Sequence, residues 1–116
     1  MPEPLIDRAT LETLASTTDK EFVGELIDTF LEDAPSLLDS LGSTLAAQDT
    51  EGFRRAAHSL KSNGASLGAM SFSASAKELE MMGKAGDLNG AEPKVEHLRA
   101  EFDQVIQALK DYQHEP

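Results

Sequence analysis

Residues 51–67 read EGFRRAAHSLKSNGASL, and this stretch decides the fold class. An α-helix turns by about 100° per residue, so side chains three and four positions apart share a face. One face of this segment is apolar, and it consists of Phe53, Ala56, Ala57, Leu60, Gly64 and Leu67. The segment therefore predicts an amphipathic helix that packs its apolar face into a core.

The preceding segment carries a longer stripe of the same period. The spacing Thr18-x-x-Glu21 is that of a capping box, and it predicts a helix start. Pro35 should kink this helix without ending it, because the apolar stripe continues past the proline. The stripe comprises Phe22, Val23, Leu26, Ile27, Phe30, Ala34, Leu37, Leu38, Leu41 and Leu45.

The rest of the chain also predicts helices, over residues 5–15, 69–84 and from about 91 to 112. Asp49 or Thr50 should cap the helix that contains residues 51–67. Short connections favour antiparallel neighbours. The expected fold is all-α, an antiparallel up-and-down four-helix bundle with a short extra N-terminal helix, formed by residues 1–116 as one domain.

Composition narrows the possible partners. The chain has 21 acidic and 10 basic residues, a formal net charge of −11. This charge disfavours nucleic acid and anionic lipid. Cysteine is absent, and neither a signal sequence nor an apolar run of membrane-spanning length is recognisable. We therefore expect a cytoplasmic monomer that binds no membrane.

His58 is the candidate reactive residue. By helical spacing it lies about 200° from Leu60, so it should point away from the core. Lys61 follows one turn later and could hold an anion on the imidazole, while Ser62 and Ala65 are small enough to admit a partner surface. The simpler alternative is an ordinary exposed histidine on a solvated helix.

The segment from Ala57 to Ala69 resembles the signature of histidine-containing phosphotransfer (HPt) domains, H-x-x-K-G followed by five residues and G. His58, Lys61 and Gly68 match in identity and spacing, whereas Ser62 replaces the first glycine. Residues 30–35 and 69–80 are similar to the family's second and fourth helices, with Leu79-Glu80 at the usual place.

The resemblance implies a phosphorelay intermediate that carries phosphate on His58, at Nε2, with Lys61 stabilising the phosphoryl group. The implied partners are receiver domains of response regulators or hybrid histidine kinases. The receiver would supply Mg²⁺, so this chain needs no cofactor or metal of its own. It would be a phosphoryl carrier without a kinase domain, accepting phosphate from a receiver aspartate or a kinase and passing it to another receiver.

The expected docking surface surrounds His58 and comprises Arg54, Arg55, Ser62, Ala65 and Leu38. Leu38 should lie level with His58 on the neighbouring helix, where the apolar arc is wider than one packed neighbour needs. For Leu38, the alternative is that the N-terminal helix covers it. For Arg54 and Arg55, the alternative is pairing with nearby acids.

Two other functions remain open. The first is a helical regulator that binds a receiver or kinase without carrying phosphate. The second is an enzyme, which the short chain and the missing phosphate-binding loop disfavour. His97 is expected to be exposed and inert, and Glu78 and Glu80, which point in different directions on one helix, are expected to form a solvated face.

Overall fold

A computed structural model of the protein describes residues 6–114 and contains five α-helices and no strand within that range. The helices are α1 (Arg8–Thr17), α2 (Lys20–Ala47), α3 (Thr50–Ser66), α4 (Met70–Ala85) and α5 (Ala91–Gln113). The predicted all-α class is confirmed. Residue 5, where the sequence predicted the first helix to begin, lies outside the described residues.

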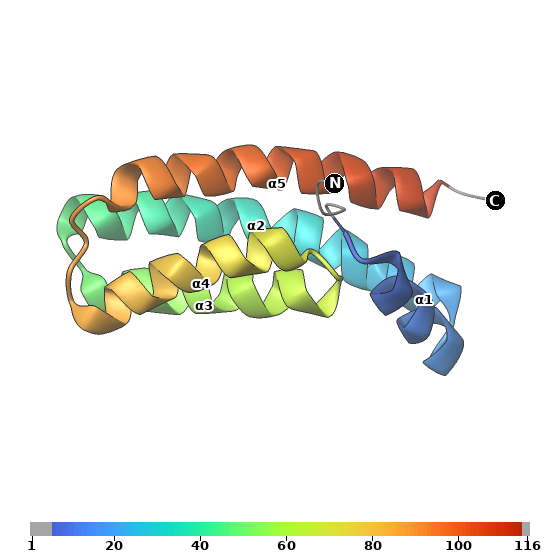
Figure 1. Cartoon of the computed structure of the whole chain (residues 1–116). Helices are drawn as coiled ribbons and strands as arrows, with labels where there is room; N and C mark the ends of the chain where they lie inside the picture. Colours follow the sequence, from blue (N-terminus) through green and yellow to red (C-terminus); the bar gives the residue numbers. More distant parts are fainter. Residues whose placement is uncertain (1–5, 115–116) are drawn as a thin grey trace.

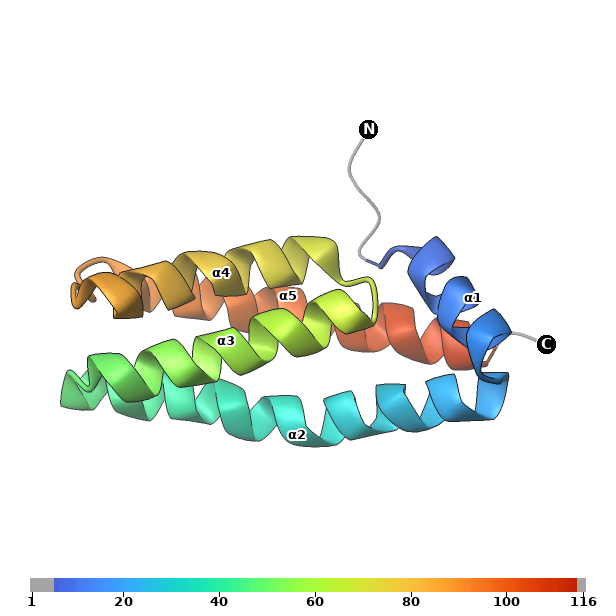
Figure 2. The ribbon, with the colours of Figure 1, turned by 90° about the horizontal axis from the view of Figure 1, so that it is seen from below.

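The four longer helices lie lengthwise beside one another, and each reverses the direction of the one before it (Figure 1, Figure 2). The short α1 lies at the end of the molecule where α2 begins and α5 ends (Figure 2). The turn between α3 and α4 lies toward the same end. Within residues 6–114, no helix has the length and hydropathy needed to cross a membrane.

Aspartates begin the first three helices. The carboxylate of Asp7 accepts a hydrogen bond from Ala9 N, and that of Asp49 accepts one from Gly52 N. The segment Thr18-x-x-Glu21 does open α2, as predicted, but the cap is Asp19 and not Thr18: its carboxylate accepts from the backbone N of Phe22 at 2.7 Å. Asp19 has the extended backbone that an N-cap requires, and its negative charge favours the positive end of the helix dipole.

The apolar faces meet in one core that draws on all five helices. At its centre, Phe30 lies edge-on to Phe72 and Phe102, with ring centroids 5.9 and 5.6 Å away. α2 continues through Pro35, as its unbroken stripe predicted. Phe22 is an exception, since its side chain is exposed. It lies about 100° around the helix from buried Val23, outside the face that packs.

Gly68 joins the N-terminal segment to the turn between α3 and α4. Its φ is +81°, and its carbonyl accepts a hydrogen bond from Asp7 N at 2.7 Å. A Cβ atom at this position would lie 2.6 Å from the Asp7 carbonyl oxygen. A side chain is therefore excluded both by the backbone conformation and by the closeness of the preceding segment.

Candidate functional site

His58 projects from α3 away from the core, as its spacing predicted. Its side chain is 54% exposed, whereas Ala57 and Leu60 on the same helix are fully buried. The exposure places the imidazole where a second protein can reach it.

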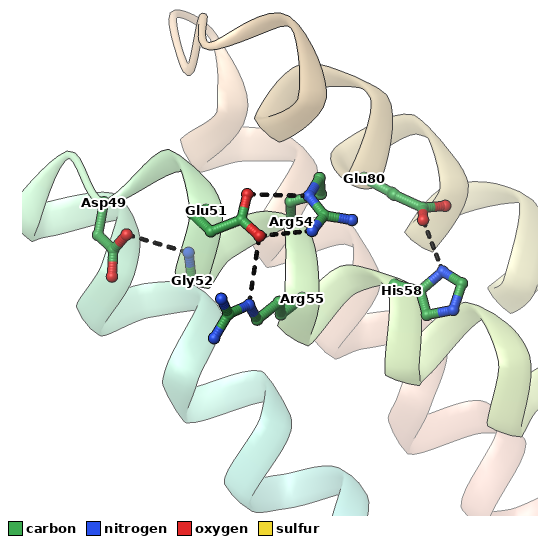
Figure 3. A network of polar contacts seen from close by, with 7 residues as sticks. All are labelled: Asp49, Glu51, Gly52, Arg54, Arg55, His58 and Glu80. Carbon is green, nitrogen blue, oxygen red and sulfur yellow. Dashed lines mark hydrogen bonds and ion pairs between the residues drawn. The ribbon is translucent and has the colours of Figure 1, made fainter.

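A carboxylate from α4 holds this imidazole. Nδ1 of His58 lies 2.6 Å from Oε2 of Glu80, and Nζ of Lys61 lies 2.7 Å from Oε1 of the same residue. Figure 3 shows Glu80 reaching from α4 to the histidine ring on α3. The carboxylate therefore bridges the two residues that the sequence singled out, with one oxygen for each.

The expectation that Glu80 belongs to a solvated face is wrong. Its side chain is only 13% exposed, because it fills the junction between α3 and α4. Glu78, two positions earlier, keeps 63% of its side chain exposed and pairs with Lys94. The sequence did contain a signal for the contact between His58 and Glu80. In a helical hairpin, residues at similar distances before and after the turn face each other, and these two stand at similar distances from Gly68.

Close packing of α4 on α3 brings Glu80 within reach. A Cβ atom on Gly83 would lie only 2.9 Å from the backbone N and the Cβ of Arg54. Ser73 donates a hydrogen bond to the backbone carbonyl of Lys61 at 2.9 Å. Gly83 and Ser73 lie about one and two turns from Glu80, so the helices are held together on both sides of it.

The ionisation of Glu80 determines which nitrogen of the His58 ring carries the proton. The hydrogen bond from Lys61, followed by that from His58, holds the pKa of Glu80 below its usual value against the opposing effect of burial. An ionised carboxylate can only accept hydrogen bonds, so Nδ1 carries the proton in this pair. The lone pair of the neutral imidazole is then on Nε2, which is the nucleophilic nitrogen.

The two arginines have a local partner. Nε of Arg54 donates to Glu51 at 3.1 Å, and Nε of Arg55 donates to the same carboxylate at 3.3 Å (Figure 3). Hydrogen bonding, chiefly from Arg54, lowers the pKa of Glu51 to about 2. The alternative that these arginines pair with a nearby acid therefore describes the free protein.

Leu38 does not form part of an exposed surface. It is 3% exposed and lies in the core, so the prediction that it stays exposed as part of a docking surface is wrong. Its neighbour Leu37 lies about 100° away around α2 and is half-buried at the edge of the core. Ser62 is exposed and Ala65 half-buried on α3, so both remain available beside the histidine.

Comparison with known proteins agrees with the resemblance to histidine-containing phosphotransfer domains. A family model described as "Hpt domain" matches residues 25–108, which include His58, Lys61 and Glu80. The crystal structure of histidine-containing phosphotransfer protein B (HptB) from Pseudomonas aeruginosa PAO1 has a TM-score of 0.89 to this fold. The two are 30% identical, over 97% of this chain and 96% of that chain. No curated protein matches.

The family match covers well over half of the chain, and the resemblance read from His58, Lys61 and Gly68 is confirmed. Hpt domains are phosphocarrier modules rather than kinases, and they interact with receiver domains. The chain belongs to the Hpt domain family, the histidine-containing phosphotransfer modules of two-component phosphorelays.

Proposed function

We propose that His58 accepts a phosphoryl group at Nε2 from an aspartate of a receiver domain, or from a kinase, and passes it to another receiver. The contact that carries this proposal is the 2.6 Å pair between His58 Nδ1 and Glu80. It leaves the opposite ring nitrogen unprotonated on an exposed side chain.

The phosphoryl group passes directly from aspartate to histidine, so the transfer needs no ATP. The Nε2 lone pair attacks phosphorus, the bond from phosphorus to the aspartyl oxygen breaks, and the aspartate leaves as a carboxylate. Both ring nitrogens are then substituted, so the ring gains positive charge, which the adjacent Glu80 carboxylate stabilises. The reverse steps deliver the group to the next aspartate.

Lys61 has a second role in this proposal. In the free protein its ammonium group donates to Glu80, and its side chain is 28% exposed. When phosphate arrives on His58, Lys61 lies between two anions, the Glu80 carboxylate on α4 and the phosphoryl group one turn away on α3. It then stabilises the phosphoryl oxygens by a charge-assisted hydrogen bond. Mg²⁺ comes with the receiver, which holds it beside the reacting aspartate.

The setting that we propose is a cytoplasmic monomer that meets receivers of response regulators or hybrid kinases. Its framework is the antiparallel four-helix bundle expected from the short connections, with α1 as the extra helix. Arg54, Arg55, Ser62 and Ala65 surround His58 on the exposed side of α3 and are the contacts proposed for the receiver.

Phosphoryl labelling tests the proposal. Incubation with a phosphorylated receiver should give an acid-labile, base-stable label that is lost in His58→Gln while the helical circular dichroism is unchanged. His97→Gln is the matched control, because His97 is also exposed and also pairs with a glutamate. A label that persists in His58→Gln contradicts the assignment. A wild-type protein that binds receivers without becoming labelled would instead be the non-phosphorylated regulator.

A further inference from the structure

Charge is distributed very unevenly over this acidic protein. Residues 50–85, which form α3, α4 and their turn, contain five basic and three acidic residues, a formal charge of +2. The remaining 80 residues contain five basic and eighteen acidic ones and carry −13. The helices that hold His58 and Glu80 are therefore the positive pole of the molecule.

The other cations near His58 each have a carboxylate partner. Arg54 and Arg55 share Glu51, which leaves one positive charge in that group, and Lys61 is paired with Glu80. Lys77 and Lys84 differ, since both are exposed and neither makes an ion pair or a side-chain hydrogen bond with any residue between 6 and 114. Within the described residues, these two lysines are the cations of α3 and α4 that have no carboxylate partner.

Lys77 and Lys84 belong to one stripe along α4. They lie one turn before and one turn after Glu80. The stripe also includes two methionines that are unusually open to solvent, Met70 at 46% and Met81 at 51% exposure. Met70, Lys77 and Lys84 are seven residues apart, and Met81 is four beyond Lys77, so all share the outer face of α4. We name Met70, Lys77, Met81 and Lys84 the α4 stripe.

We propose that the α4 stripe is a docking edge for the acidic face of the receiver that exchanges phosphate with His58. This inference rests on the proposed function. A receiver that presents an aspartyl phosphate and holds Mg²⁺ must gather carboxylates and phosphate oxygens at that face. Unpaired lysines on either side of Glu80 attract this face, and the exposed methionines supply adaptable apolar contact next to it.

The formal charge of −13 on the rest of the chain should also orient an approaching partner. An acidic partner is repelled from α2 and α5 and attracted to α4, so it meets the molecule on the side where His58 is exposed. Salt screens exposed charges over about 8 Å at physiological ionic strength, so the effect is local to α4 and disappears in concentrated salt. The stripe should therefore act mainly on the rate of association.

Charge reversal on α4 tests the stripe. The second-order rate constant for transfer from a phosphorylated receiver should fall roughly tenfold or more in Lys77→Glu/Lys84→Glu at about 50 mM salt. The difference from wild type should largely vanish at about 500 mM salt. The rate of His58 labelling by phosphoramidate, which needs no docking, should be unchanged.

Lys20→Glu/Lys110→Glu is the matched control, because it makes the same change in net charge at two exposed lysines on α2 and α5. The inference is overturned if both double variants slow equally, since net charge alone would then explain the effect. It is also overturned if the α4 variant is slow with phosphoramidate, or equally slow in high salt. Failure of the wild type to accept phosphate from any donor would contradict the proposed function itself.

Discussion

Nδ1 of His58 and Oε2 of Glu80 lie 2.6 Å apart, although 22 positions separate the residues in the chain. The contact joins the helix that carries the reactive side chain to the helix packed against it. It orients the imidazole ring, places the ring proton on Nδ1, and puts a negative charge where the proposed phosphorylation of His58 would create a positive one.

The tautomer of His58 is directly measurable. In ¹⁵N NMR spectra near pH 8, the neutral His58 ring should be mainly in the Nδ1–H form. His97 bonds to Glu101 through Nε2, so it should show the opposite tautomer in the same spectrum. Glu80→Ala should shift His58 toward Nε2–H and slow phosphotransfer, with His97 unaffected. An unchanged His58 tautomer in that variant would show that Glu80 does not set it.

Lys61→Ala should leave the fold intact and slow phosphotransfer. One charge-assisted hydrogen bond contributes about 1.5–3 kcal/mol, which corresponds to a loss of roughly tenfold or more. Rapid-quench measurement of transfer from a phosphorylated receiver checks this. Lys61→Arg keeps the charge and should recover part of the rate, whereas full wild-type rates in Lys61→Ala would remove the residue from the mechanism.

Acid should weaken the bridge. The pKa of Glu80 lies below its usual 4.5 in the folded protein, chiefly because of Lys61. A carboxyl group whose folded pKa is lowered stabilises the protein above its unfolded pKa, and this stability is lost as pH falls through the folded pKa. The difference in unfolding free energy between wild type and Glu80→Gln should therefore be constant near neutral pH and shrink below about pH 4.5. Urea titrations at several pH values measure it, and a difference that grows in acid would contradict the pairing.

Gly83→Ala should disturb the site from a distance. The added methyl group would lie 2.9 Å from backbone and Cβ atoms of Arg54, so α4 must move away from α3. We expect lower stability and a weaker Glu80 contact, seen as a changed His58 tautomer. Gly24→Ala is the control, since nothing lies within 4 Å of the added carbon and helix propensity alone should stabilise it by about 0.5–1 kcal/mol. Equal stabilisation in both variants would refute the close packing.

Leu38 and Leu37 should respond differently to a charge. Leu38→Asp places a carboxylate in the core and should reduce the free energy of unfolding by more than about 3 kcal/mol. Leu37→Asp, at the half-buried edge, should cost about 1 kcal/mol and leave a folded protein. Urea unfolding of the two variants decides between them. If Leu37→Asp is the more destabilising, the assignment of core and edge on α2 is reversed.

Residues 51–67 alone determined the helix, its buried face, the outward position of His58 and the proximity of Lys61. These are relations within one helix, and about 100° per residue is sufficient to compute them. The family resemblance likewise depends on spacing along a single helix and its following turn, in which Gly68 is required by its positive φ.

The tertiary structure decided the relations between helices. The partner of His58 depends on how far α4 is shifted and rotated against α3, which close packing at Gly83 and Ser73 determines. Leu37 and Leu38 both belong to one broad apolar arc, and only the packing of the other helices around α2 distinguishes the edge from the core. Helical periodicity shows which residues share a face, but not which other helix covers that face. For this reason the sequence predicted that Glu80 and Leu38 are exposed, whereas helix packing largely buries both.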